Sequence, residues 1–314
     1  MPFKIKKSPR TATALRWLGT ILTTGLFIWL VSGQKWDVVL QKASGISPWA
    51  IGLALVFYVC TYAFNTLRWC CLLWAQDVKI TFLQAFRLAW AGIFASNFLF
   101  STIGGDGFRM VGVLRYTGRK TVAIGSVMLD RIINVAAMAC LLPAPLLIFW
   151  RSLIFGMAQP GAVLVLPAGL RKLFERYFPK IANAFRVWAS RPGAFVYAFL
   201  AAWPSNLFPM AATYLIAHQL GMNVSFWQVI GVQTLTYFIS QLPSINGYGF
   251  REMAYTTLYA ALGASIEQAS TLALVTRFIS VAATVPGALW LSGAVTDVAF
   301  NDADPGDETE AGQP

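Results

Sequence analysis

The octapeptide TIGGDGFR, residues 102–109, decides the fold, because a second version of it, SINGYGFR, occupies residues 244–251. The two copies lie 142 residues apart and are identical at five of eight positions. Each is rich in glycine and ends on an arginine, although apolar sequence surrounds it. A segment of this kind that occurs twice indicates an internal repeat.

The similarity extends to both sides of the octapeptide. Upstream, KITFLQ at 79–84 aligns with NVSFWQ at 223–228, and downstream LDRIINVAA at 129–137 aligns with VTRFISVAA at 275–283. The three pairs of segments occur in the same order, and the separation between the two copies varies by only four residues. This pattern predicts the duplication of a unit too long for a solenoid repeat. The alternative is chance similarity between two apolar stretches.

The composition predicts an all-α polytopic membrane protein. Hydrophobic residues make up 57% of the 314 residues, charged residues 12%, and the mean hydropathy is +0.60. A soluble domain of this composition would expose apolar surface that it could not bury. The net charge of +11 comes from Lys and Arg clustered between apolar runs, which is typical of cytoplasmic loops. We therefore expect contact with an anionic leaflet and not with nucleic acid.

No catalytic, metal or cofactor pattern stands out. All four cysteines lie in apolar runs without metal-type spacing to the single His218, and no Ser-His-Asp, Cys-His or polar carboxylate pair occurs. The glycine octapeptides follow no strand, so they do not indicate nucleotide binding. We expect neither an enzyme nor a bound metal or cofactor.

We expect about six full spans and two re-entrant helical hairpins, with both termini in the cytoplasm because basic residues precede the first, uncleaved span. The expected spans are 15–32, 48–74, 121–150, 152–170, 194–219 and 267–295, of which 152–170 is the weakest. The hairpins are expected at 82–120 and 226–263. Between them, 171–191 is either a basic amphipathic helix on the leaflet or a solvated loop.

Each hairpin is predicted to turn inside the membrane, where broken backbone is tolerated only if protein or a water-filled cavity satisfies it. In the first copy we place the turn at the paired glycines, with Asp106 as the cap of the helix that follows or as a substrate contact. In the second copy a proline stops the helix and an asparagine restarts it. The predicted turn residues are Gly104, Gly105, Gly107, Pro243, Asn246, Gly247 and Gly249.

An odd number of spans separates the two copies, which makes them antiparallel. We therefore predict a single transmembrane domain, 1–298, with a first repeat at about 48–150, an inverted second repeat at about 194–297, and an acidic disordered tail, 299–314. Inverted repeats with broken helices are typical of transporters, which bind substrate near the midplane.

Charged residues at membrane depth are the candidate substrate-binding site. They are Asp106, Arg109, Asp130, Arg131, Arg251, Glu252 and Arg277. Facing lipid they would cost about 20 kcal/mol together, more than the roughly 5–15 kcal/mol that stabilises a typical domain. We therefore expect them to face one another or water.

The arginines of this set occupy matching places in the two copies, and four arginines around helix N-termini suit a phosphate or another anion. The alternative is that these charges only form ion pairs that lock the hairpins. Side chains of adjacent residues on a helix, such as Asp130 and Arg131, point in different directions, so each is expected to pair with another segment. For Arg68, near the end of its span, we expect snorkelling to the headgroups over a substrate role.

The paired motifs resemble those of the transmembrane flippase domain of lysylphosphatidylglycerol synthases. The motifs are Asn97-x6-Gly104-Gly105-Asp106-x2-Arg109, Asp130-Arg131, and Gln241-x-Pro243-x2-Asn246-Gly247-x-Gly249-x-Arg251-Glu252, and the resemblance covers about 10–298. It implies a multi-pass protein of a bacterial or archaeal plasma (inner) membrane. The sequence ends at Pro314 without an aminoacyl-transferase domain, so lipid aminoacylation is not expected.

The resulting hypothesis is a flippase- or scramblase-like lipid transporter. Its substrate would be an anionic, aminoacylated, polyprenyl-linked or hopanoid lipid, whose headgroup passes a charged cavity between the hairpins. The alternatives are a secondary transporter of a small anionic solute and a non-transporting partner subunit of a lipid-modifying enzyme. The sequence leaves a homodimer open.

Overall fold

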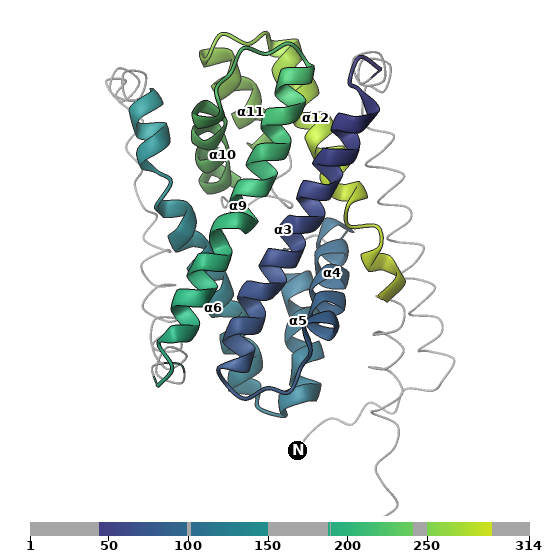
Figure 1. The fold of residues 1–314 in the computed structure, drawn as a ribbon, viewed down its shortest axis with the longest axis vertical. Helices are drawn as coiled ribbons and strands as arrows, with labels where there is room; N and C mark the ends of the chain where they lie inside the picture. The colour runs from purple at the N-terminus through teal and green to yellow at the C-terminus, as the bar shows by residue number, and fades with distance from the viewer. Residues whose placement is uncertain (1–43, 99–101, 150–187, 189, 241–249, 291–314) are drawn as a thin grey trace, which may run out of the picture.

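The computed structural model describes residues 44–98, 102–149, 188, 190–240 and 250–290. Every regular element within them is a helix (Figure 1). In chain order the helices are α3 (Pro48–Trp74), α4 (Phe82–Phe98), α5 (Thr102–Thr117), α6 (Lys120–Ala139), α9 (Gly193–Gln219), α10 (Phe226–Ser240), α11 (Phe250–Ala261) and α12 (Ile266–Ala282).

Within the described residues, three helical runs are long and apolar enough to cross a membrane, namely Pro48–Trp74, Lys120–Phe149 and Ile266–Trp290. The last two continue α6 and α12 beyond a short break. An all-helical membrane protein is therefore confirmed. The total of six spans stays a prediction, because the expected spans 15–32 and 152–170 lie outside the described residues. The tail 299–314 and most of 171–191 also lie outside them.

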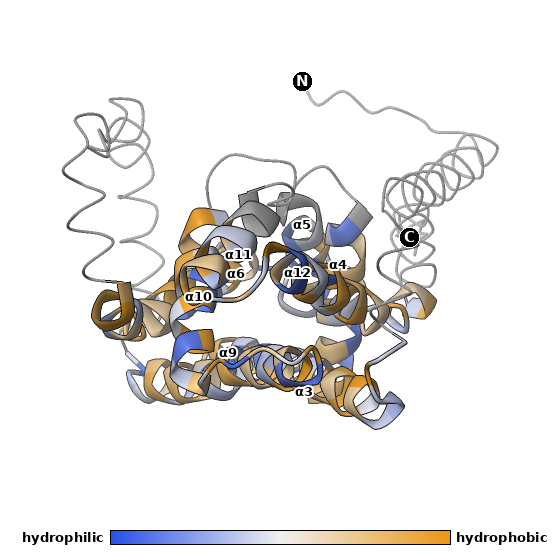
Figure 2. Ribbon diagram, turned by 90° about the horizontal axis from the view of Figure 1, so that it is seen from above, coloured by the Kyte–Doolittle hydropathy of each residue, from blue (hydrophilic) through white to orange (hydrophobic). Residues whose placement is uncertain are grey.

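The long helices α3 and α9 run antiparallel and form one layer of the molecule (Figures 1 and 2). Helices α4, α6, α10 and α12 pack on this layer, α5 packs on α4 and α6, and α11 packs on α10 and α12. At one end of the pair, the Ser47 hydroxyl donates to Gln219 Oε1 at 2.8 Å. At the other end, the buried Trp188 indole donates to the Leu72 carbonyl at 2.8 Å. These two contacts fix the register of α3 against α9. Helix α9 is 27 residues long, but it is not among the three apolar runs and contains Pro204 and Pro209.

Two shorter helical pairs, α4 with α5 and α10 with α11, pack near opposite ends of the α3–α9 layer (Figure 1). Such pairs are what the two predicted hairpins require. Re-entry into a membrane and the inverted orientation of the copies stay predictions.

The turn that we predicted at Gly104 and Gly105 is wrong. Both glycines, and Gly107 after them, lie inside α5, which begins at Thr102. Gly105 instead allows α5 to approach α4 closely, because a Cβ there would overlap the Gly92 carbonyl oxygen. In the second copy, Pro243, Asn246, Gly247 and Gly249 lie outside the described residues.

The two halves share backbone features at the separations that the sequence repeat predicts. Asp77 and Gly221, 144 residues apart, both follow a long helix in the left-handed region, with φ of 57° and 70°. Gly118 and Gly263 do the same after α5 and α11, with φ of 62° and 89°. Both α4 and α10 begin with reciprocal side-chain caps, from Thr81 with Gln84 and from Ser225 with Gln228. These coincidences support a duplicated unit.

Candidate functional site

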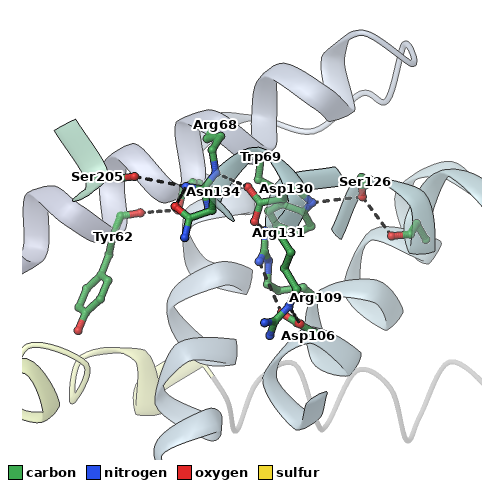
Figure 3. A network of polar contacts seen from close by, with 12 residues as sticks. Tyr62, Arg68, Trp69, Asp106, Arg109, Ser126, Asp130, Arg131, Asn134 and Ser205 are labelled. Atoms are coloured by element: carbon green, nitrogen blue, oxygen red, sulfur yellow. Dashed lines mark hydrogen bonds and ion pairs between the residues drawn. The ribbon is translucent and has the colours of Figure 1, made fainter. Parts of the chain in front are cut away.

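Asp130 is the centre of a buried ionic cluster at the junction of α3, α5 and α6 (Figure 3). Its residue is 2% exposed. Oδ1 lies 2.6 Å from Arg68 Nε, and Oδ2 lies 3.0 Å from Arg109 Nη2. Because both carboxylate oxygens are bound by guanidinium groups, Asp130 acts as a fixed bridge between the three helices.

Arg68 does not snorkel, so that expectation is wrong. It is 4% exposed and is bound on α6 by the Asp130 carboxylate. The physical reason is its direction, since Arg68 projects from α3 into the bundle and meets an acid there. A paired guanidinium needs no headgroup to satisfy it.

Asp106 and Arg131 form the outer layer of the cluster. Arg131 Nε donates to Asp106 Oδ2, and Arg109 Nη1 lies 3.7 Å from Asp106 Oδ1. The Arg131 side chain is 47% exposed, whereas that of Arg68 is 5% exposed. As expected, Asp130 and Arg131 pair with other segments and not with each other. Asp106 does not cap α5, because it is the fifth residue of that helix.

Trp69 holds Arg109 from a third direction. The Arg109 guanidinium carbon lies 4.2 Å from the centroid of the Trp69 ring. The buried Trp69 indole is itself fixed, since its Nε1 donates to Ser126 Oγ at 3.2 Å. This cation–π contact and the two carboxylates leave only one buried Arg109 nitrogen, Nε, without a hydrogen bond.

Asn134 extends the cluster toward the second half of the chain. It lies one helical turn after Asp130, and its Oδ1 accepts from Arg68 Nη1 at 2.6 Å. Its Nδ2 donates to the Tyr237 hydroxyl on α10 at 3.2 Å. Arg68 Nη1 also lies 3.3 Å from Ser205 Oγ on α9. Polar side chains four residues apart on an apolar helix were the sequence signal for Asn134, whereas Ser205 and Tyr237 had none.

The cluster lines a cavity of about 360 Å³. Its walls contain three arginines and two aspartates, so the charged lining has a net charge of +1. Such a site suits a monoanion that binds guanidinium groups in bidentate fashion, as a phosphodiester does. The lining residues are Asn65, Arg68, Ala89, Ile93, Asp106, Arg109, Asp130, Arg131, Asn134, Val135 and Tyr237.

The structure brings together only the first-copy members of the predicted set. Arg277 on α12 is half-buried but is not among the residues lining this cavity. Arg251 and Glu252 begin α11, and their side chains lie outside the described part of the chain. The four predicted arginines are therefore not assembled at this cavity.

The second half also lacks the centre of the cluster. The positions that match Arg68 and Asp130 are Ala212 and Thr276, and both are fully buried. The Thr276 hydroxyl donates to the Leu272 carbonyl within its own helix. With no acid at this place, the second half cannot build the same bridge.

Among the described residues, no three His, Cys, Asp or Glu side chains lie close enough together to hold a metal ion. The polar groups that line the cavity are guanidinium, carboxylate, amide and phenol groups.

Comparison with known proteins gives one match. The family described as "Lysylphosphatidylglycerol synthase TM region" matches residues 16–287, which include every described helix. No curated protein and no solved structure matches the chain.

Proposed function

Because the chain belongs to the lysylphosphatidylglycerol synthase transmembrane-region family, we propose that it transports a lipid with an anionic headgroup between the leaflets of a plasma (inner) membrane. The headgroup passes the charged cavity while the acyl chains remain in the bilayer. We propose transport and not catalysis, with a multi-pass arrangement in which α4–α5 and α10–α11 are the two re-entrant hairpins of an inverted repeat.

The observation that carries this proposal is the net positive cavity within an apolar helical bundle. Charges inside a membrane are costly and mark substrate pathways when they face a cavity. The Asp130 carboxylate is already bound on both oxygens, by Arg68 and Arg109, and needs no further charge. Asp106 and Arg131 add a second layer, in which the half-exposed Arg131 is the group that a ligand reaches first.

The two layers of the cluster have different roles in the proposed transport. Asp130 keeps Arg68 and Arg109 in place, while Asp106 occupies Arg131 when no lipid is bound. An incoming phosphodiester takes over the Arg131 guanidinium and the Nη1 group of Arg109, which are the groups that Asp106 contacts, and Asp106 is displaced. Exchange of one anion for another keeps the binding reversible, as transport requires.

The sequence has no nucleotide-binding motif, so we propose that a gradient or the imbalance of the lipid itself drives the movement. The energy source does not affect the first test.

Leaflet exchange in proteoliposomes tests the proposal. Tail-labelled phosphatidylglycerol in the outer leaflet is bleached chemically, and the protected fraction is followed over time. We expect the wild type to exchange the lipid faster than empty vesicles. We expect Arg131→Ala and Arg109→Ala to slow this exchange about 10- to 100-fold, because each removes a charge-assisted contact to the phosphate.

Arg191→Ala is the matched control. Arg191 forms an exposed bidentate pair with Asp77, both distances being 3.0 Å, and does not line the charged cavity. Its exchange rate should equal that of the wild type. Folded wild-type protein that fails to accelerate exchange would refute lipid transport, and uptake of free phosphate by the same vesicles would favour the solute transporter instead.

A further inference from the structure

A second, smaller polar pocket adjoins the charged cavity. It has a volume of about 170 Å³, and Tyr237 lines both spaces. The Tyr237 hydroxyl accepts a hydrogen bond from Asn134, which is itself bonded to Arg68. Tyr237 is therefore shared by the two spaces, and no described residue accepts a hydrogen bond from its hydroxyl.

The lining of this pocket is polar but uncharged. It contains two amides, three hydroxyl groups and two thioethers, and no Asp, Glu, Lys, Arg or His is among its lining residues. They are Met138, Asn206, Pro209, Met210, Gln233, Thr236, Tyr237 and Ser240. Groups of this kind recognise neutral hydroxyl-bearing ligands, since they offer both donors and acceptors without a charge.

Two polar atoms of the pocket are buried without a hydrogen-bond partner, Asn206 Nδ2 and Thr236 Oγ1. Apart from Thr234, the other buried threonines among the described residues bond to a nearby backbone carbonyl, as Thr213 does by donating to the Pro209 carbonyl at 3.0 Å. A buried polar group left unpaired is destabilising and needs an explanation. A ligand that hydrogen-bonds to these atoms provides one.

Gln233 is held in a fixed position beside them. Its Nε2 donates to Thr213 Oγ1 at 2.6 Å and lies 3.5 Å from the Pro209 carbonyl, on the proline-containing part of α9. The amide of Gln233 is thereby oriented before any ligand arrives, which lowers the entropic cost of binding.

We propose that the pocket binds the hydroxyl-bearing end of the headgroup, a glycerol or a sugar, while the phosphodiester occupies the charged cavity. This assignment rests on the proposed function and narrows its substrate to lipids with a neutral, hydroxylated headgroup beyond the phosphate. An amine would instead require a carboxylate, and the pocket has none. Tyr237, at the boundary, contacts the bond between the two parts.

Binding of two short-chain lipids to the purified full chain in detergent tests this inference. Dihexanoyl-phosphatidylglycerol and dihexanoyl-phosphatidylmethanol are both monoanionic phosphodiesters, and the glycerol headgroup adds two carbon atoms, each with a hydroxyl group, to the methyl of the other. Affinities are obtained from the ligand-dependent rise of the unfolding midpoint. We expect the wild type to bind the glycerol lipid about tenfold more tightly, the effect of one or two hydrogen bonds.

Thr236→Val and Asn206→Leu should reduce this ratio to about one without weakening the binding of phosphatidylmethanol. Thr234→Val is the matched control, because the Thr234 hydroxyl is also buried and unpartnered but does not line the pocket. Its ratio should stay at about ten.

Equal affinities of the wild type for the two lipids would overturn the inference, as would a ratio that all three variants retain. Tighter binding of dihexanoyl-phosphatidylethanolamine than of the glycerol lipid would also overturn it. The proposed function fails separately: discrimination between headgroups without leaflet exchange would refute transport alone, and exchange without discrimination would refute only the headgroup assignment.

Discussion

Arg68 Nε and Asp130 Oδ1 lie 2.6 Å apart with both side chains almost fully buried, and they join α3 to α6. Removal of one partner leaves an uncompensated charge inside the bundle. We therefore expect Asp130→Ala to lower the free energy of unfolding by about 3–5 kcal/mol. Asp106→Ala should cost about 1 kcal/mol or less, since its partner Arg131 is half-exposed. Reversible unfolding in mixed micelles measures both.

A double variant distinguishes the effect of the buried charge on stability from the effect of the packing around Asp130. Arg68→Met combined with Asp130→Leu replaces the buried pair by apolar side chains of similar size, which is often neutral for stability. We expect it to recover the part of the loss seen for Asp130→Ala that comes from the unpaired Arg68, whereas Arg109 still lacks its Asp130 partner. A double variant as unstable as Asp130→Ala would mean that packing around Asp130, and not its charge, determines the stability.

The contact between α4 and α5 gives a second prediction. A Cβ on Gly105 would overlap the Gly92 carbonyl oxygen and the Ser96 hydroxyl, so Gly105→Ala should force the helices apart at a cost of about 1–3 kcal/mol. Gly107 lies two residues later on the same helix and has nothing within 4 Å of its Cβ position.

Gly107→Ala is therefore the control and should be neutral or stabilise the protein by about 0.5–1 kcal/mol, because alanine favours a helix. The unfolding midpoints of Gly105→Ala and Gly107→Ala, measured under the same conditions, test this prediction. Equal effects at both positions would show that the glycines do not serve close helix packing.

The clustering of the first-copy charges Asp106, Arg109, Asp130 and Arg131 could be predicted from the sequence, because the cost of exposing them to lipid leaves few alternatives. Their partners could not. Whether Arg68 faces headgroups or Asp130 depends on the rotation of α3 relative to α6, and an apolar helix with weak periodicity leaves that angle undetermined. The tertiary packing of the two helices settles it.

The prediction of a turn at Gly104 and Gly105 was wrong for a related reason. A Gly-Gly pair serves equally well in a turn and in a close helix contact, and sequence alone does not distinguish the two uses. The repeat, in contrast, was visible in the sequence as three pairs of matching segments, and the helix ends at Gly118 and Gly263, where a positive φ favours glycine, support it.

Asp106 gives the last prediction, which concerns ligand binding. It accepts from Arg131 and lies 3.7 Å from Arg109, so it competes with an anionic headgroup for both arginines. Asp106→Asn keeps the shape of the side chain but removes its charge, which raises the net charge of the cavity lining from +1 to +2. Dihexanoyl-phosphatidylmethanol should then bind about fivefold more tightly or better, equivalent to about 1 kcal/mol.

Asp77→Asn is the matched control for this effect. Asp77 also pairs with an arginine, Arg191, but it is exposed and does not line the cavity. The same overall charge change at this position should leave the affinity unaltered, because exposed charges are screened by salt. If both variants bind more tightly to the same extent, the general charge of the protein attracts the lipid, and Asp106 does not act as the competing anion. Tighter binding confined to Asp106→Asn, together with slower leaflet exchange, would mean that release of the headgroup depends on the return of the Asp106 carboxylate to Arg131.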